Sequence, residues 1–276
     1  MERDEVGNPI LLSGTNTDIT ERKKMEDTIR DYLANLESRV KERTVELVSR
    51  NRELQDFVSI ASHDLQEPLR KITIFSSMLE NELSDSLSES VRGHLNRISG
   101  AAQRMRTLIK SLLQFSSVIN QARPFERINL KEIAEEVLQE NLYGLVEEQQ
   151  AQVEISDLPE IDADPIQISQ LFQNLIANAI RYSKDGDRPK VKIKCEEKDD
   201  KWIKIKVEDN GMGFDMKYLE KIFQPFERLS TDGKTKGTGM GLAICKKIAE
   251  RHGGTITAES RSGEGAIFIV ELPNCS

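Results

Sequence analysis

The order of hydrophobic and polar positions divides the chain into a helical first part and a mixed second part. From residue 20 to about residue 120, apolar side chains recur at every third or fourth position, which places them on one face of an α-helix. From about residue 125 onward, helical stretches are separated by short segments in which apolar and polar residues alternate, the period of a half-buried strand. These patterns predict a multi-domain protein in which an all-α part is followed by an α/β sandwich.

Residues 20–56 contain no glycine or proline and carry a heptad-like apolar stripe between balanced acidic and basic side chains. The stripe consists of Met25, Ile29, Tyr32 and Leu36, then Val40, Leu47, Leu54 and Ala61. Each series keeps a 3.5-residue period, and the phase slips between Leu36 and Val40, which is a stutter. We predict a dimeric coiled coil over residues 20–56. A single surface helix is the alternative, but so long and polar a helix would have nothing to pack on.

Residues 57–122 continue the helical pattern with one break, at residues 84–86. The first arm is expected to end near Glu82, and the second to run from about Ser88 to Val118. The apolar face of the second arm consists of Leu95, Ile98, Ala102, Met105, Leu108, Ile109, Leu112 and Phe115. Two arms and a short turn predict a helical hairpin, and two hairpins would bury these faces as a four-helix bundle in a homodimer.

Residues 123–276 predict one α/β domain. Helices are expected at residues 130–148, 165–182 and from about 239 to 252, and strands at 153–155, 190–195, 202–208, 254–259 and 266–272. At the other end of the chain, residues 1–19 are turn-rich around an apolar segment at 10–12. Because a lone strand is not stable by itself, we expect this segment to be the last strand of a larger sheet that precedes the chain.

The composition argues against several classes of protein. The formal net charge of -8 argues against binding to nucleic acid, which usually requires a basic surplus. The sequence has no run of 18 apolar residues and no basic-then-apolar leader, so neither a membrane span nor a secretory signal is expected. Cys195, Cys245 and Cys275 are far apart and odd in number, which favours a reducing compartment without a disulfide framework or a zinc site. We expect a cytoplasmic protein.

Three polar residues share one face of the helix predicted at residues 165–182. Asn174, Asn178 and Arg181 are spaced i, i+4 and i+7. Any one of these side chains would be unremarkable on a solvated helix face. Together, two amide oxygens and a cation suit a magnesium ion and phosphate oxygens, because magnesium prefers hard oxygen ligands.

Two glycine-containing motifs follow in the sequence. Asp209-Asn210-Gly211-Met212-Gly213 comes directly after a predicted strand, where an aspartate can accept a hydrogen bond from an exocyclic amine and glycines allow a flat base to approach the backbone. Gly237-Thr238-Gly239-Met240-Gly241 opens a predicted helix and would present N–H groups to phosphates. Taken singly, each motif is equally compatible with an ordinary turn or a flexible loop.

Ser62-His63-Asp64-Leu65-Gln66-Glu67-Pro68-Leu69 lies on the first arm of the predicted hairpin. A neutral imidazole on an exposed helix face is a usable nucleophile, and the neighbouring Asp64 carboxylate can orient the ring and accept its proton. Pro68 removes a main-chain donor just beyond the site, where we expect a bend. His94 lacks such a setting, and His252 precedes two glycines at a helix end, where a capping role suffices.

The motifs of the second half, together with Phe223-Gln224-Pro225-Phe226-Glu227-Arg228, resemble in order and spacing the ATP-binding domain of sensor histidine kinases. That domain belongs to the wider gyrase, Hsp90 and MutL ATPase group, and the resemblance spans roughly residues 125–272. The segment around His63 resembles the phosphoacceptor box of the same kinases. Residues 14–22 resemble the exit of a PAS sensor domain, which implies that residues 1–19 are a sensor remnant and that signals pass down the coiled coil.

The resemblance implies roles for individual residues. Asn178 would be the principal magnesium ligand with Asn174 beside it, Arg181 would contact phosphate, Tyr182 would lie against the adenine, and Asp209 would bind its amino group. The glycines expected to frame the lid over the triphosphate are Gly211, Gly213, Gly237, Gly239 and Gly241. The implied cofactors are ATP and Mg²⁺.

The implied reaction is transfer of the γ-phosphoryl group of ATP to His63, followed by relay to an aspartate of a response regulator. Related kinases often dephosphorylate that regulator with a Thr, Asn or Gln four residues after the histidine. Here that position is Glu67, so we expect weak or absent phosphatase activity. Two alternatives remain: a gyrase- or Hsp90-like clamp ATPase, which would not need the His63 segment, and a dimeric scaffold with an inactive pocket.

Overall fold

The computed structural model describes residues 6, 18, 20–82, 88–120, 123–184, 186–199, 201–229 and 237–274. The chain forms two compact units, Met1–Asp56 and Phe57–Ser276. The terminal strand predicted at residues 10–12 and the helix break predicted at residues 84–86 lie outside the described residues, as does Cys275. No helix within the described ranges is long and apolar enough to cross a membrane.

The first part of the chain consists of two long helices, α1 (Thr20–Glu82) and α2 (Glu89–Asn120), so helix extends through the predicted coiled-coil segment and both arms of the predicted hairpin. α1 continues through Pro68. In the second unit, Leu69 of α1 forms a small buried cluster with Ala102 and Ile109 of α2. Apolar side chains along both helices remain exposed, as Met25, Ile29, Tyr32, Leu36, Val40, Leu65, Ile72, Phe75, Met78, Ile98 and Met105 do.

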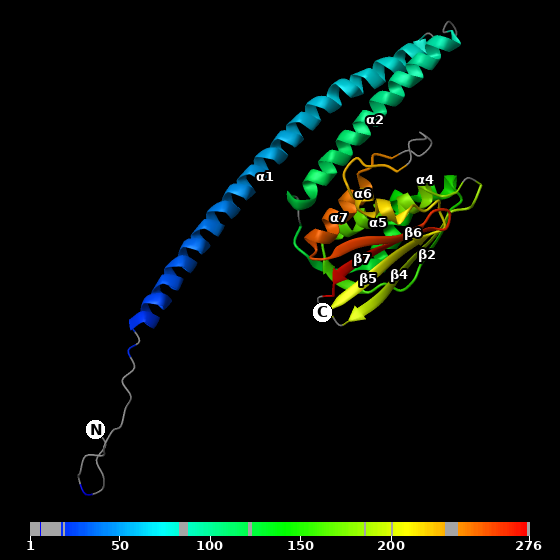
Figure 1. The fold of residues 1–276 in the computed structure, drawn as a ribbon. Helices are drawn as coiled ribbons and strands as arrows, with labels where there is room; N and C mark the ends of the chain where they lie inside the picture. The colour runs from blue at the N-terminus through cyan, green and yellow to red at the C-terminus, as the bar shows by residue number, and fades with distance from the viewer. Residues whose placement is uncertain are drawn as a thin grey trace. The chain divides into compact units, whose positions relative to one another are not determined.

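The second part is an α/β sandwich whose five-stranded sheet has the order β2-β4-β5-β7-β6 (Figure 1). Its strands are β2 (Gln152–Ile155), β4 (Lys190–Asp199), β5 (Trp202–Asp209), β6 (Thr255–Arg261) and β7 (Gly265–Pro273). β2 pairs parallel with β4, and the other pairs are antiparallel. Helices α5 (Pro165–Arg181) and α7 (Gly241–Arg251) cover one face. The predicted fold class, an all-α part followed by an α/β sandwich, is confirmed.

Two short strands were missed from the sequence. β1 (Glu126–Asn129) and β3 (Glu160–Ala163) form a separate antiparallel pair, in which Ile128 is opposite Ile161. Four residues with several charges are too short to show a two-residue period. Each strand leads directly into a helix, because Asn129 and Asp164 are the N-caps of α3 (Leu130–Glu136) and α5.

The stretch predicted as one helix at residues 130–148 is interrupted. After α3 comes a π-helical turn, Val137–Asn141, and then α4 (Tyr143–Glu148). The Leu142 N–H bonds to Val137 O at 3.0 Å, and the Leu142 side chain is buried. A π turn contains one residue more than an α turn, too small a change to disturb the helical apolar spacing that predicted a continuous helix. Two short elements, η2 (Met216–Tyr218) and α6 (Leu219–Ile222), follow β5.

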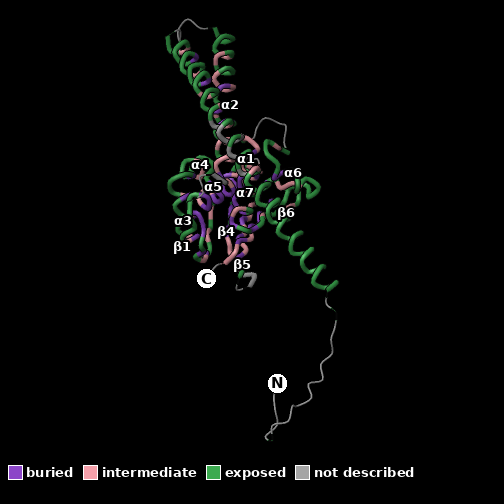
Figure 2. Tube along the Cα trace, turned by 90° about the vertical axis from the view of Figure 1, so that its left-hand side faces the viewer, coloured by how far each residue is buried: buried purple, intermediate pink, exposed green. Residues whose placement is uncertain are grey.

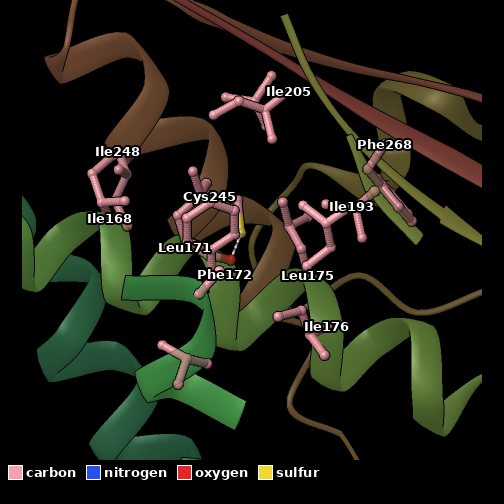
Figure 3. Close-up of a cluster of buried hydrophobic side chains, with 14 of the residues drawn as sticks. Ile168, Leu171, Phe172, Leu175, Ile176, Ile193, Ile205, Cys245, Ile248 and Phe268 are labelled. Carbon is pink, nitrogen blue, oxygen red and sulfur yellow. Dashed lines mark hydrogen bonds between the residues drawn. The ribbon is translucent and has the colours of Figure 1, made fainter. Parts of the chain in front are cut away.

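The core lies between the sheet and α5 and α7. Figure 2 shows buried residues concentrated there, whereas α2 is largely exposed. Figure 3 shows Ile168, Leu171, Phe172, Leu175 and Ile176 of α5 in one buried cluster with strand residues Ile193, Ile205 and Phe268 and α7 residues Cys245 and Ile248. Fully burying each large apolar side chain stabilises the fold by about 1.5–3 kcal/mol. Burial also raises the pKa of the Cys245 thiol, which keeps it protonated and unreactive.

Candidate nucleotide and phosphoacceptor sites

The polar face of α5 lies beside the amino end of α7. Asp164 starts α5 by accepting hydrogen bonds from the N–H groups of Ile166 and Gln167. The apolar stripe of α5 is buried in the core, which leaves Asn174 and Asn178 half-buried and Arg181 exposed. A Cβ atom on Gly241, the first residue of α7, would lie 3.3 Å from Oδ1 of Asn174. The amide of Asn174 therefore adjoins a helix N-terminus, where anions are stabilised.

Tyr182 connects the end of α5 to both glycine motifs. Its carbonyl oxygen accepts a hydrogen bond from the Met212 N–H at 2.8 Å, and a Cβ on Gly211 would lie only 2.4 Å from that oxygen. On the other side, a Cβ on Gly237 would lie 3.8 Å from the Tyr182 hydroxyl. The structure thus brings together three segments separated in the sequence.

Asp209 ends strand β5 and is half-buried. Its Oδ1 accepts hydrogen bonds from the N–H groups of Gly211, at 2.8 Å, and Ala266, at 3.2 Å. Burial raises the pKa of this carboxyl above its usual value, although both hydrogen bonds oppose that rise because they favour the ionised form. Within the described residues both donors bond to Oδ1, which leaves Oδ2 as the oxygen available to a ligand.

The second glycine motif packs against the turn after α6. Gly239 has φ +72°, and a Cβ there would lie 2.7 Å from Glu227 O and 2.8 Å from the Phe226 carbonyl carbon. Both the conformation and the contact require glycine. Residues 230–236, which precede the motif, lie outside the described residues. Met240, the N-cap of α7, makes no side-chain cap, so the first N–H groups of this helix can serve an anion.

The proposed phosphoacceptor is exposed, whereas Asn174, Asn178 and Asp209 are half-buried. The side chain of His63 on α1 is 80% exposed, and its Nδ1 lies 3.3 Å from Oδ1 of Asp64. Ser62 and Leu69 of the same helix are buried, so the helix turns one face inward and presents His63 outward. The α/β domain does not cover the imidazole in this conformation. Transfer of a group from that domain to His63 therefore requires the domain to move.

Two family models match the chain. Residues 163–275 match the histidine kinase-, DNA gyrase B- and HSP90-like ATPases, and residues 53–121 match the His kinase A (phospho-acceptor) domain. A similar protein is the phytochrome-like protein Cph1 of Synechocystis sp., 41% identical over 223 residues. The chain belongs to the sensor histidine kinase family. The aligned residues make up 81% of this histidine kinase core but only 29% of Cph1, so the chain corresponds to less than a third of that relative.

Solved structures agree with this assignment. The histidine kinase ThkA in complex with the response regulator TrrA has a TM-score of 0.56 and 25% identity, covering 81% of this chain and 64% of that one. Full-length ShkA in complex with AMPPNP has a TM-score of 0.60 over 79% of this chain and 45% of that one. At 22% identity, ShkA supports the fold alone.

In this kinase core, side chains of the α/β domain bind the carboxyl end of α2. Lys247 Nζ donates a hydrogen bond to Phe115 O at 2.9 Å and lies 4.1 Å from the centroid of the Phe115 ring. Gln167 Nε2 donates to Val118 O at 2.6 Å, satisfying one of the last helix carbonyls, which have no partner within the helix. Burial lowers the pKa of Lys247. No sequence signal marked Lys247 or Gln167.

His252 makes contacts in the kinase beyond those of the predicted capping role. It is the C-cap residue of α7, but its ring is also buried and stacks on Phe125 with centroids 4.6 Å apart. Nε2 accepts a hydrogen bond from the Asp164 N–H at 3.1 Å, and Nδ1 lies 2.8 Å from Ile248 O. Burial lowers the pKa of His252, so the ring is neutral and donates through Nδ1.

Asp164 is the centre of this buried polar group. Its Oδ2 accepts hydrogen bonds from the Arg123 N–H at 3.0 Å and from Arg251 Nη1 at 2.9 Å, and Arg251 Nη2 also bonds to Arg123 O. Burial alone would raise the pKa of Asp164, but these hydrogen bonds outweigh it and hold the pKa below its usual value. The group ties the start of α5 to the segment that follows α2.

Proposed function

We propose that this chain transfers the γ-phosphoryl group of ATP to His63 and then passes it to an aspartate of a response regulator. The observation that carries the proposal is the convergence of the α5 face, Asp209 and both glycine motifs around Tyr182 in the chain that exposes His63. The families of both matched regions support it.

Each of the proposed nucleotide-binding residues would contact the part of ATP that its chemistry suits. Asp209 offers Oδ2 to the exocyclic amine of adenine while its Oδ1 is held by two N–H groups. The Tyr182 ring would lie against the base. Arg181 and the N–H groups that open α7 would neutralise phosphate charge, because an uncapped helix N-terminus favours anions. The glycine motifs, which tolerate no side chain where they contact Tyr182 and Glu227, would close the site.

Magnesium fits the residues on α5. Asn174 and Asn178 present amide oxygens, which are hard ligands, and Asn174 Oδ1 lies next to the amino end of α7. We propose Asn178 as the principal ligand with Asn174 beside it. When bound, the ion would neutralise charge on the phosphate oxygens. These two residues would hold it on the polar face of α5.

The orientation of His63 suggests which nitrogen reacts. With Nδ1 turned toward Asp64, the tautomer that donates Nδ1–H to the carboxylate leaves the lone pair on Nε2. Nε2 would attack the γ-phosphorus, an N–P bond would form, and the bond from phosphorus to the β–γ bridging oxygen would break as ADP leaves. The Nδ1 proton stays shared with Asp64, which stabilises the ring as it becomes cationic. A receiver carboxylate then attacks phosphorus and the N–P bond breaks.

The proposed partners follow from the helical part. Exposed apolar residues on α1 and α2 would be buried in a homodimer through the coiled coil at residues 20–56 and the hairpin at residues 57–122. The response regulator is proposed by similarity to ThkA, whose solved structure includes one. Nucleic acid is not a proposed partner, given the net charge of -8.

We also propose the domain boundaries and the setting. Residues 1–19 would be the remnant of an upstream PAS-like sensor domain, and residues 123–276 the ATP-binding domain. The odd number and wide spacing of the three cysteines suit the reducing cytoplasm, where the chain would meet the proposed response regulator.

Incubation of the full chain with γ-labelled ATP and magnesium tests the proposal. We expect an acid-labile, base-stable label that is lost in His63→Ala and kept in His94→Ala, a matched exposed histidine on α2. Free phosphate without protein label would instead favour the clamp ATPase. Neither label nor hydrolysis would favour the scaffold with an inactive pocket.

A further inference from the structure

The hairpin of β6 and β7 lies directly against the loop that carries Asp209. The Ala266 N–H donates to Asp209 Oδ1, and the Gly263 N–H donates to Met212 O at 2.6 Å. A Cβ on Gly265, which has φ +101°, would lie 2.1 Å from Asp209 O. The backbones are therefore too close for a side chain between them. The hairpin and the Asp209 loop are in direct backbone contact.

One hydroxyl group joins these two segments. Ser260 Oγ accepts a hydrogen bond from the Phe214 N–H at 2.8 Å and donates one to Gly265 O at 2.8 Å. Ser260 is half-buried on β6, where it pairs with Ala266 of β7. The hydroxyl uses both its donor and its acceptor capacity, and each bond is to a backbone group. It thus fixes the end of the Asp209 loop to the strand whose N–H holds Oδ1.

We propose that Ser260 is a positioning residue for base recognition. By holding the hairpin in place, it keeps the Ala266 N–H on Oδ1 of Asp209 and so directs Oδ2 toward the exocyclic amine of adenine. The inference rests on the proposed function, because it assumes that Asp209 binds the base of ATP. Ser260 acts through Asp209 and does not itself touch the nucleotide.

The ionised form of Asp209 is favoured by the N–H group that Ser260 helps to position. Burial favours the neutral form of the carboxyl, and the Ala266 N–H is one of two donors that favour the ionised form. Without the Ser260 hydroxyl, Phe214 N–H and Gly265 O lose their partner in a half-buried place, and the hairpin is free to shift. A displaced Ala266 N–H would let the carboxylate turn, so that Oδ2 no longer meets the amine in a fixed direction.

A comparison of ATP with inosine triphosphate separates this role from a purely structural one. Inosine triphosphate has the same phosphates and sugar but lacks the exocyclic amine. Direct binding of each nucleotide to the full chain gives the preference for ATP. In Ser260→Ala we expect that preference to fall about three- to tenfold, roughly the effect of one well-placed hydrogen bond, with inosine triphosphate affinity unchanged.

Control variants test whether the Ser260 hydroxyl acts through the Asp209 carboxylate. Ser262→Ala, an exposed serine on the same hairpin, should keep the wild-type preference, as should Ser260→Thr, which retains the hydroxyl. In an Asp209→Ala background, Ser260→Ala should have no further effect on the preference, because the carboxylate through which it acts is gone. Should Ser260→Ala fail to fold, Ser260→Cys replaces it, and a smaller fall in the same preference is expected because a thiol is a weak donor and acceptor.

The possible outcomes are distinct. Equal loss of affinity for both nucleotides, or an unchanged preference in Ser260→Ala, overturns the role of Ser260 while leaving the proposed function intact. A wild-type chain that binds both nucleotides without preference overturns base recognition by Asp209 and this inference with it. Binding of neither nucleotide to the wild-type chain contradicts the proposed function itself.

Discussion

The hydroxyl groups of Ser111 on α2 and Thr238 in the second glycine motif are joined by a hydrogen bond, with 3.2 Å between their oxygens. Thr238 also accepts from the Met240 N–H at 3.3 Å, so the motif that opens α7 is tied directly to the helical hairpin. Lys247 on α7 adds its bond to Phe115 O. These contacts hold the α/β domain against α2. Since His63 is uncovered in this conformation, they would oppose the approach of that domain to the histidine in the proposed phosphoryl transfer.

Removing the Ser111 hydroxyl is expected to speed phosphorylation of His63. Loss of one neutral hydrogen bond, about 1 kcal/mol, should raise the rate in Ser111→Ala roughly two- to fivefold with ATP affinity unchanged. Ser77→Ala is the matched control, because Ser77 and Ser111 both donate to the carbonyl four residues back, at 3.0 Å. Rapid-quench measurement of the label checks this. A slower or unchanged rate would show that the contact does not restrain the domain.

Asn178→Ala is expected to abolish labelling of His63 by weakening magnesium-dependent nucleotide binding. The proposed ligand oxygen is lost, whereas the Asp209 side of the pocket is untouched. Binding of ATP should therefore fall at least roughly tenfold with magnesium, the scale of one charge-assisted contact, and change little in the presence of EDTA. Gln173→Ala, half-buried on another face of α5, should behave as wild type. Equal loss with and without magnesium would argue against a metal ligand.

Glu67→Gln is expected to increase dephosphorylation of the response regulator. Glu67 lies one helical turn after His63 and pairs with Lys71 at 3.3 Å, and its negative charge would repel a phosphoryl group and orient an attacking water poorly. An amide removes the charge, and we expect roughly a tenfold gain in phosphate release from phosphorylated regulator with ADP. Glu82→Gln, exposed at the end of α1, is the control. Fast release by the wild type that depends on Glu67 would refute the expectation.

His252 should make stability depend on pH below about 6.5, the ordinary histidine pKa. Its pKa is lowered in the folded protein, so the unfolded chain, with a histidine pKa of about 6.5, binds the proton more readily. The free energy of unfolding should therefore be largest above about pH 6.5 and decrease as pH falls through the folded pKa. Below this window, carboxylates such as Asp164, whose pKa is also lowered, add to the loss.

Urea denaturation across this pH range provides the measurement. His252→Asn should be less stable at pH 8, because Asp164 N–H and the Phe125 ring lose their partner, and its stability should vary less as pH falls below about 6.5. His94→Asn should retain the wild-type slope, since that histidine is exposed. An unchanged slope in His252→Asn would mean that another group titrates in this window.

Much of the fold follows from local patterns. The helix predicted at residues 165–182 is α5, where an aspartate cap, a proline and an apolar helical period coincide. The strand Trp202–Asp209 alternates between buried and half-buried residues, because one of its faces packs on helices. No recognisable apolar period marks the π turn at Val137–Asn141 or the short strands β1 and β3, because each is shorter than the window over which a period can be recognised.

The sequence by itself determined the chemistry offered at each position: an imidazole beside a carboxylate at His63, amides on one face of α5, and an aspartate followed by glycines at Asp209. Only the tertiary structure decided which backbone groups hold these side chains. The bond from Asp164 N–H to His252 and the bridge from Phe214 to Gly265 through Ser260 join residues far apart in the chain. Periodicity records whether a residue faces core or solvent, whereas such bonds depend on how separate elements pack together.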